Sequence, residues 1–344
     1  MKMRFPFSLT ASMTRHILIQ GLKGVKKYPL VLMLEPLFKC NLRCAGCGRI
    51  REYAEHMTEM LSVEECLDSM NECGAPIVSI CGGEPLIYPE IGELVRRTVF
   101  EQKRHVYLCT NGLMLKKHIE DGTFRPTSRF FINVHLDGME KNHDASTSRT
   151  GVWSAAVEGL KAAVEAGFQV CTNTTLYRES SVDEITELCT MLESLGVCSM
   201  MLAPAYSYET FDAESQGSLF LVREETQARF RELEKRLKGK RLATTPLYMD
   251  FLTGRRQLPC AAWANPTRNV CGWKGPCYLL TDAHYATYRE LLEKTAWETL
   301  GPTGSDPRCT NCMMHCGFEP GAVLVSTKDP IQGLRTMLWQ LGIF

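Results

Sequence analysis

The sequence has no long hydrophobic stretch, because none of its apolar runs approaches the roughly 18 residues that a helix needs to cross a bilayer. It has no excess of either charge: 39 lysines and arginines balance 39 aspartates and glutamates, which gives no reason to expect a nucleic-acid partner. It also lacks an internal repeat, a low-complexity tract and a recognisable signal peptide. We therefore expect a cytoplasmic protein, long enough at 344 residues for a large domain and a smaller one.

Cysteine, in contrast, is abundant, with 16 residues. Several of these cysteines stand at the short spacings typical of metal ligands, and no signal peptide directs the chain to an oxidising compartment. The composition therefore favours a metal-binding protein over one held together by disulfides.

The first 34 residues contain no acidic side chain, since Glu35 is the first carboxylate of the chain. Their apolar residues recur at helical spacing and predict a basic amphipathic helix within residues 1–29. Such a helix either lies on an anionic membrane surface or caps the fold with its apolar side, and the sequence leaves both open. The basic residues are Lys2, Arg4, Arg15, Lys23, Lys26 and Lys27, and the apolar residues are Met13, Ile17, Leu18, Leu22 and Val25.

Short β-rich runs alternate with helical patterns between residues 30 and 204. This alternation predicts an α/β fold in which a parallel sheet curls into a partial, TIM-like (β/α)6 barrel. One of its helices, Ser62–Cys73, begins with a capping-box signal formed by Ser62 and Glu65. Residues 205–344 are expected to form a smaller cysteine-rich C-terminal domain that includes a charged helix over Val222–Lys238. The expected strands are Leu30–Leu34, Ile77–Ile80, Val106–Cys109, Phe130–His135, Val170–Thr175 and Ser199–Ala203.

A cysteine motif follows the first expected strand. Cys40, Cys44 and Cys47 have the spacing C-x3-C-x2-C, and three thiolates on one tight loop can hold three irons of a [4Fe–4S] cube while the fourth iron stays open. The alternative is a zinc site, but structural zinc takes four ligands and no fourth cysteine or histidine stands nearby in the sequence. The motif therefore predicts an iron–sulfur cluster with a free coordination position.

Polar and glycine-rich segments follow the other strands directly. Parallel barrels build their sites at the carboxyl ends of their strands, so these segments are expected to meet the cysteine loop. Glycines allow close approach of a backbone or ligand, and a glutamate beside them can accept hydrogen bonds from an ammonium group. Each residue has the alternative of a structural role at the barrel rim. The candidates are Gly82, Gly83, Glu84, Asn111, His135, Asp137, Asn173 and Ala203.

The cysteine loop and Gly82-Gly83-Glu84-Pro85 together resemble radical S-adenosylmethionine (radical SAM) enzymes. The resemblance implies that SAM binds the open iron, that Gly82, Gly83 and Glu84 hold its methionine part, and that Asn111, His135, Asp137, Asn173 and Ala203 contact cofactor or substrate. It also implies a low-potential electron donor such as ferredoxin or flavodoxin. The chain departs from the superfamily at Gly46, where an aromatic residue usually precedes the third cysteine.

The C-terminal cysteines resemble part of the SPASM/twitch pattern of auxiliary clusters. One further [4Fe–4S] cluster is expected there, with a zinc knot as the alternative. The expected ligands are Cys260, Cys277, Cys309 and Cys312, with Cys316 in reserve.

Several longer segments narrow the resemblance to the adenosylhopane synthase (HpnH) family of hopanoid biosynthesis. They include Tyr28–Phe38, Val106–Asn111, Val134–Gly138, Ala203–Tyr208 and Cys309–Pro320. This resemblance implies addition of the 5′-deoxyadenosyl radical to the alkene of diploptene, a hydrophobic triterpene (a hopene), and a peripheral membrane contact through the N-terminal helix.

Cys109 gains a candidate role from the same resemblance. The radical left after addition needs a hydrogen atom, and the Cys109 thiol at a strand end is a candidate donor; the alternative is a buried, inert thiol. Two other functions stay open. One is a SPASM-type enzyme that abstracts hydrogen from a peptide or other substrate and releases 5′-deoxyadenosine; the other is a non-catalytic iron–sulfur or zinc protein.

Overall fold

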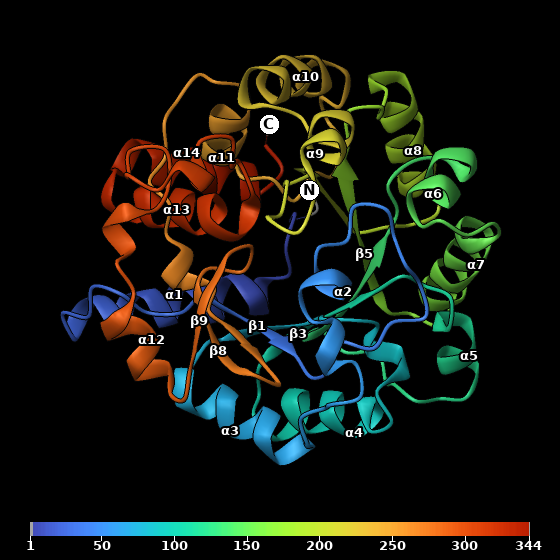
Figure 1. The fold of residues 1–344 in the computed structure, drawn as a ribbon, viewed down its shortest axis with the longest axis horizontal. Coiled ribbons are helices and arrows are strands. Elements are labelled where there is room, and N and C mark those ends of the chain that lie inside the picture. The colour runs from blue at the N-terminus through green and yellow to red at the C-terminus, as the bar shows by residue number, and fades with distance from the viewer. Residues whose placement is uncertain (1–2, 344) are drawn as a thin grey trace.

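A single curved sheet of nine strands organises the protein, which we describe from a computed structural model over residues 3–343 (Figure 1). The strand order is β6-β5-β4-β3-β2-β1-β7-β8-β9, and β1 to β6 are parallel neighbours in chain order. This confirms the partial barrel that the β/α alternation predicts. The parallel strands are β1 (Val31–Glu35), β2 (Ile77–Ile80), β3 (His105–Thr110), β4 (Phe130–His135), β5 (Gln169–Leu176) and β6 (Ser199–Pro204).

Three strands from the C-terminal part extend this sheet beyond β1. Strand β7 (Thr267–Asn269) pairs parallel to β1, and β8 (Gly272–Pro276) and β9 (Thr281–Tyr285) follow in antiparallel pairing. The sequence predicts loops here, because these strands are short and rich in glycine and polar residues. The same sheet therefore contains β1, which precedes the cysteine loop, and three strands of the C-terminal part. The division of the chain into domains at residue 204 stays a prediction.

Helices cover the outer side of the parallel strands (Figure 1). The side chain of Ser62 accepts a hydrogen bond from the Glu65 amide at 3.2 Å, and the Glu65 carboxylate accepts one from the Ser62 amide at 2.7 Å, which confirms the capping box. The helices of this half are α2 (Arg49–Glu52), α3 (Val63–Cys73), α4 (Ile91–Arg96), α5 (Leu115–Glu120), α6 (Glu140–Ser146), α7 (Val152–Glu165) and α8 (Val182–Ser194), with a π-helical turn at Arg97–Glu101.

The remaining helices lie before and after this barrel segment. The N-terminal segment meets the last helix, where the Arg4 amide donates to the Gln340 carbonyl at 3.0 Å, so the described ends of the chain lie side by side (Figure 1). These helices are α1 (Phe7–Leu22), α9 (Ala213–Leu219), α10 (Arg223–Arg236), α11 (Pro246–Leu252), α12 (Tyr288–Lys294), α13 (His315–Lys328) and α14 (Pro330–Gln340).

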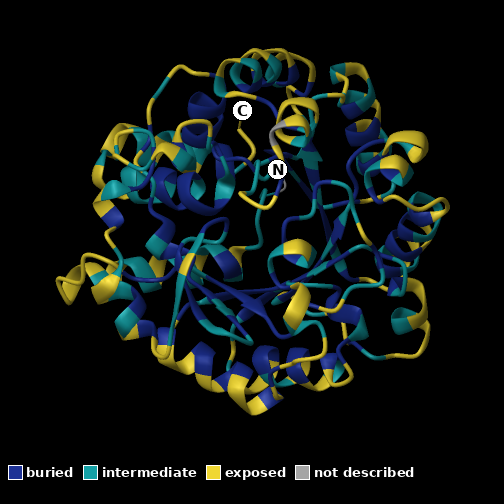
Figure 2. Ribbon diagram, in the orientation of Figure 1, coloured by how far each residue is buried: buried dark blue, intermediate teal, exposed yellow. Residues whose placement is uncertain are grey.

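Buried residues concentrate on the strands and on the inward faces of the helices (Figure 2). Along β3 and β4 the fully buried Leu108 and Ile132 alternate with the half-buried Cys109 and Asn133, so apolar residues pack against the helices while polar residues face the barrel interior. The strand register aligns Cys109, Asn133, Cys171 and Ser199 across β3 to β6. The interior of the barrel is therefore lined by polar side chains and thiols at this level, whereas Tyr107 and Phe131 stack on each other nearer the amino ends of β3 and β4.

Helix α1 buries only Leu9 and leaves Phe7, Leu18 and Leu22 between 61% and 89% exposed. Its amphipathic pattern is thus only partly used by packing against the barrel. Among residues 3–343, no helix combines the length and the apolar character needed to cross a membrane.

Candidate functional site

The three cysteines of the C-x3-C-x2-C motif lie on one loop after β1, each partly buried. Burial, with smaller effects of Glu84 and Cys47, raises the pKa of Cys40 to about 11, and burial with its two neighbouring motif cysteines raises that of Cys44. The Leu42 amide lies 3.4 Å from the Cys40 sulfur as a donor. The sulfurs are therefore gathered in a partly dry loop that supplies hydrogen-bond donors, a donor set that suits an iron–sulfur cluster.

Gly82 and Gly83 hold the backbone that leads into this loop. Two backbone hydrogen bonds join the segments. The Gly83 amide donates to the Leu37 carbonyl at 2.9 Å, and the Glu84 amide donates to the Lys39 carbonyl at 2.9 Å. Gly82 has a φ of +106°, and a Cβ on Gly83 would overlap the Lys39 carbonyl oxygen. The close approach that these glycines allow is therefore used by the cysteine loop's own backbone.

Glu84 is fully buried, and protein groups surround its carboxylate. It accepts hydrogen bonds from the Thr110 hydroxyl at 2.7 Å, from the Asn111 amide at 2.8 Å and from the Leu86 amide at 3.0 Å. Asn111 in turn donates from its side chain to the Asn41 side chain at 2.7 Å, inside the cysteine loop. Glu84 and Asn111 therefore tie the ends of β2 and β3 to the loop, and a SAM contact through Glu84 stays a prediction.

Two tyrosines fill the space beside the glycines of the cysteine loop. A Cβ on Gly46 would overlap the ring of Tyr177, which follows β5, and a Cβ on Gly48 would overlap the ring of Tyr208, beyond β6. The aromatic neighbour that the sequence lacks at position 46 thus comes from another strand. Sequence reasoning missed Tyr177, because 131 positions separate it from Gly46 (177 − 46).

His135 and Asp137 form an ion pair at the end of β4, with 2.9 Å between Nε2 and Oδ2. Although burial alone would lower it, Asp137 raises the pKa of His135; the same pair lowers the pKa of Asp137 against the opposing effect of burial. Asp137 also accepts hydrogen bonds from the Thr175 amide at 2.9 Å and the Ser146 hydroxyl at 3.1 Å. His143, not singled out by the sequence, accepts from the Asp137 amide at 3.1 Å.

Asn173 stands beside this pair, since it is the register partner of His135 on the neighbouring strand β5. Its side-chain Oδ1 is buried and has no hydrogen-bond partner in the protein. A buried amide oxygen without a partner is costly, which favours a ligand at this position. Ala203 is buried one strand further, in register with Thr175.

Cys109 lies deeper in the lumen than His135. Its sulfur is 3.3 Å from the Ser79 hydroxyl and accepts a hydrogen bond from the Asn133 side chain at 3.5 Å. Burial raises the pKa of this thiol despite both contacts, so it carries its hydrogen at neutral pH. A hydrogen-donor role for Cys109 is compatible with this protonation state and stays a prediction.

A buried set of charges links the cysteine loop to the C-terminal part. Arg49, two residues after Cys47, pairs with Glu35 of β1 at 2.6 Å and donates to the Tyr278 carbonyl at 2.5 Å. Its guanidinium also lies 4.2 Å from the Tyr278 ring centre. Lys274 of β8 is fully buried, pairs with Glu52 at 3.2 Å, and has its pKa lowered to about 8 by burial and by Arg49.

The C-terminal cysteines gather in one place. Burial and neighbouring thiols, Cys277 first, raise the pKa of Cys316, and Cys260 and Cys312 influence it too. Gly317 makes room for the Cys260 sulfur, which a Cβ there would approach to 2.5 Å. The Leu280 amide lies 3.4 Å from the Cys277 sulfur as a donor.

Tyr208 connects the two cysteine groups. Burial, Cys47 and Cys316 all raise its pKa, and its ring packs edge-on against Tyr206 at 5.6 Å. Tyr206 in turn donates to the Arg308 carbonyl, next to Cys309, at 3.2 Å.

In the described residues no three or more His, Cys, Asp or Glu side chains are arranged as ligands around a single metal ion.

Fold and site together suit an iron–sulfur protein built on an incomplete parallel barrel. Residues 34–192 match the model of the radical SAM superfamily, and residues 200–336 match a domain of unknown function, DUF3463. The chain therefore carries a radical SAM region over residues 34–192, which a cysteine-rich C-terminal region follows. Its cofactors are a [4Fe–4S] cluster and SAM.

Relatives with curated names match the barrel half. The chain is 28% identical to the GTP 3′,8-cyclase of Aquifex aeolicus over 173 residues, which is 48% of this chain and 54% of that protein. It is 32% identical to GTP 3′,8-cyclase 1 of Mycobacterium tuberculosis H37Rv over 171 residues, or 46% of each chain. The chain thus spans about half the length of these relatives.

Solved structures match more of the chain at lower identity. SuiB of Streptococcus suis covers 92% of this chain and 78% of its own, with a TM-score of 0.64 and 15% identity. The enzyme anSMEcpe, solved with AdoMet and the Cp18Cys peptide, covers 85% and 88%, with a TM-score of 0.53 and 15% identity. At these identities the likeness shows a shared fold.

The prediction of an adenosylhopane synthase is wrong by these comparisons, because the curated relatives are GTP 3′,8-cyclases. The cysteine loop and Gly82–Glu84, on which the resemblance depends, are predicted to hold a cofactor that the whole superfamily shares, so they carry no information on the substrate. Hopanoid and lipid metabolism, the diploptene substrate and adenosyl transfer to an alkene are withdrawn with it.

Proposed function

We propose that the chain is a radical SAM enzyme that abstracts a hydrogen atom from a peptide or another polar substrate and releases 5′-deoxyadenosine. The observation that carries this proposal is a cavity of about 650 Å³ beside the cysteine loop. Its lining combines apolar surface, including Tyr53, Tyr208 and Leu279, with the polar side chains of Glu52, His56, Glu59, Glu209, Thr281 and His284.

Residues close in the chain to each cysteine group line the cavity. Tyr208, which packs against Gly48 of the cysteine loop, forms part of one wall, and Leu279 and Thr281, shortly after Cys277, form part of another. A molecule held here would contact residues that follow both proposed cluster sites in the chain. This position supports a substrate role for the cavity.

The chemistry of the lining favours a peptide substrate over a nucleoside triphosphate. No lysine or arginine is among the described residues that line the cavity, whereas carboxylates and imidazoles are. Burial, followed by the nearby Lys274, lowers the pKa of His284 to about 4, so its ring is neutral and can donate or accept a hydrogen bond. Backbone amides and polar side chains of a peptide match such a surface.

The residues have separate proposed tasks. Cys40, Cys44 and Cys47 hold the cluster, which, when bound with SAM and reduced, supplies one-electron cleavage of SAM to methionine and a 5′-deoxyadenosyl radical. Asn173 offers its unpaired amide oxygen to the ligand, and His135 with Asp137 fixes the polar rim beside it. Cys109 returns a hydrogen atom from its thiol where the substrate radical requires one.

The C-terminal cysteines form a second site under this proposal. Cys260, Cys277, Cys309 and Cys312 hold an auxiliary [4Fe–4S] cluster, and Cys316 lies within the same group. A ferredoxin or flavodoxin supplies the electrons.

Hydrogen abstraction is tested by isotope transfer. The anaerobically reconstituted protein is incubated with SAM, dithionite and either a perdeuterated peptide digest or perdeuterated nucleotides, and 5′-deoxyadenosine is analysed by mass spectrometry. We expect a one-deuterium mass increase with the peptides. An increase only with nucleotides contradicts the substrate class, and an absence of 5′-deoxyadenosine contradicts the activity.

Matched variants make this assay specific. Cys44→Ala removes a proposed cluster ligand and is expected to abolish 5′-deoxyadenosine formation. Cys66→Ala changes a buried thiol on α3, outside both cysteine groups, and this variant is expected to form 5′-deoxyadenosine as the unchanged protein does.

We also propose that α1 rests on an anionic membrane surface, since Phe7, Leu18 and Leu22 are exposed on a helix followed by Lys23, Lys26 and Lys27. Co-sedimentation with vesicles tests this. We expect the protein to bind vesicles that contain phosphatidylserine and Leu18→Glu/Leu22→Glu to abolish this binding. If the same amount of protein sediments with and without vesicles, the proposal is contradicted.

A further inference from the structure

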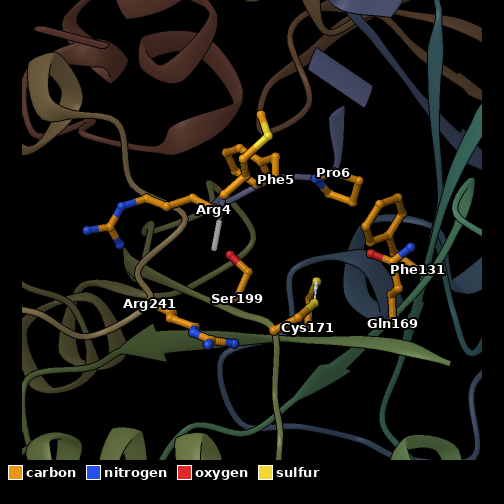
Figure 3. Close-up of a pocket in the computed structure, with 10 residues that line it drawn as sticks. Arg4, Phe5, Pro6, Phe131, Gln169, Cys171, Ser199 and Arg241 are labelled. Atoms are coloured by element: carbon orange, nitrogen blue, oxygen red, sulfur yellow. Dashed lines mark hydrogen bonds between the residues drawn. The ribbon is translucent and has the colours of Figure 1, made fainter. Parts of the chain in front are cut away.

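Two thiols face each other near the amino ends of β5 and β6, away from the cysteine loop. The sulfur of Cys171 on β5 lies 3.4 Å from that of Cys198, the residue directly before β6. Figure 3 shows this contact as a dashed line at the pocket beside the N-terminal segment. Neither cysteine belongs to the cluster loop or to the C-terminal cysteine group.

The strand spacing around these thiols puts their Cα atoms within the range that a disulfide spans. Cys171 is the register partner of Ser199, and the Cys198 amide donates to the Val170 carbonyl at 2.8 Å. Neighbouring strands lie about 4.8 Å apart and one residue advances about 3.3 Å, so the two Cα atoms are roughly 6 Å apart. Disulfides join Cα atoms that are about 4.4 to 6.8 Å apart.

The pair lies at a cavity of about 230 Å³. The N-terminal residues Met3 to Pro6 form one side of it, and Phe131, Gln169, Ser199 and Arg241 contribute to the other (Figure 3). Cys171 is buried and Cys198 is half-buried, so a small reagent reaches the pair through Cys198. The cavity also leaves room for the sulfurs to move together.

We propose that Cys171 and Cys198 form a reversible dithiol–disulfide pair at the base of the barrel. Oxidation joins the two sulfurs and removes both thiol protons and two electrons. With diamide as the oxidant, the nitrogen–nitrogen double bond takes up these electrons and protons and becomes a hydrazine. This proposal is independent of the substrate of the enzyme.

The disulfide would act on the edge of the sheet. In the described sheet β6 is the last strand beside β5, its outer side is bridged at Met200 to Leu242, and the chain continues from β6 to Tyr206 and Tyr208 beside the cysteine groups. A covalent bond at the start of this strand restrains its separation from β5. The neighbouring thiol and burial raise the pKa of Cys171, so this thiol stays protonated at neutral pH until an oxidant is supplied.

The test is a peptide map of the anaerobic, cluster-loaded protein after treatment with diamide. The remaining thiols are alkylated in acid-quenched, denatured samples, and trypsin is used without reduction. Cleavage after Lys161, Arg178 and Arg223 places Cys171 in peptide 162–178 and Cys198 in peptide 179–223. We expect these two peptides to be joined, and dithiothreitol to separate them while the iron content stays unchanged.

Cys189 provides the matched control, because it lies in the same tryptic peptide as Cys198 but is buried on α8. Cys189→Ser keeps the cross-link, whereas Cys171→Ser and Cys198→Ser each abolish it. A wild-type protein in which diamide leaves both thiols alkylatable, or joins either one to another cysteine, overturns the proposal. The wild-type map decides this even if a variant fails to fold.

Discussion

At the scale of single residues, the contact between Gly46 and Tyr177 makes a sharp prediction. A Cβ at position 46 would overlap the Tyr177 ring, so Gly46→Ala forces that ring out of its place beside the cysteine loop. Overpacking of this kind costs about 1–3 kcal/mol. We expect a lower melting temperature of the anaerobic protein and less iron bound after reconstitution.

The partner change tests whether the contact is responsible. Tyr177→Leu shortens the side chain, and in that background Gly46→Ala is expected to cause little further loss. Gly21→Ala is the control, because nothing lies within 4 Å of a Cβ at that position. Additive effects of the two changes would show that the overlap is not the cause.

The His135–Asp137 pair predicts a pH dependence. The pKa of His135 is raised and that of Asp137 is lowered, so the pair is fully charged between about pH 4 and pH 6.5. Its contribution to stability is lost as the pH rises through the raised pKa of His135, and also as the pH falls through the lowered pKa of Asp137. Asp137→Asn should therefore lower the melting temperature more at pH 6 than at pH 9.

Asp144→Asn is the control for this measurement, since Asp144 accepts hydrogen bonds from the Gly151 and Trp153 amides and has no ion pair in the described structure. Its effect is expected to be similar at the two pH values. If Asp137→Asn also lowers the melting temperature equally at both pH values, the ion pair makes no pH-dependent contribution to stability.

The sequence predicts site residues that are close in the chain and misses those assembled by the fold. Cys40, Cys44 and Cys47 are recognisable because a single loop carries all of them. Tyr177 and Tyr208 meet this loop only after β5 and β6 take their places, and nothing in the sequence marks the pairing. Gly82 and Gly83 are recognisable as special, but only the structure shows that the backbone of residues 37–39 fills the space beside them.

At the scale of elements, Arg49 fastens α2 to β1 and to the loop after β8. Arg49→Met leaves the Glu35 carboxylate buried without its cation, and breaking a buried pair in this way costs about 3–5 kcal/mol. We expect a correspondingly large fall in the free energy of unfolding, measured with urea.

Two further variants interpret this loss. Glu35→Gln/Arg49→Met removes both charges and should recover part of the stability. Arg96→Met breaks an exposed pair with Glu93, where at most about 1 kcal/mol is expected. Equal losses for Arg49→Met and Arg96→Met would contradict the role of burial.

The elements that periodicity predicts are those with a uniform environment. Strands β1 to β6 alternate with amphipathic helices and were predictable to within a few residues. Strands β7 to β9 were not, because β8 carries a fully buried lysine and two glycines, and a buried charge has no hydrophobic signature. Lys274 is tolerated there because Glu52 and the Tyr278 carbonyl receive its hydrogen bonds.

At the scale of the whole molecule, the two cysteine groups predict the iron content. If each holds a [4Fe–4S] cluster, reconstituted protein binds about eight irons per chain. Cys40→Ala/Cys44→Ala/Cys47→Ala and Cys309→Ala/Cys312→Ala should each retain about four. Iron and zinc are measured together by mass spectrometry, and zinc in place of the second set of irons would assign the C-terminal group as a zinc knot.

The pairing of β7 with β1 has a consequence for how the chain folds during synthesis. The first strand of the barrel receives its second neighbour only when residues 267–269 have left the ribosome, long after β2 to β6 are complete. Until then one side of β1 is an open edge, and the nascent barrel is a candidate for chaperone binding. The boundary between the two matched families does not coincide with a boundary of the sheet, because β1 and β7 pair across it. A chimaera that exchanges the C-terminal part between relatives must therefore take β1 and β7 from the same protein.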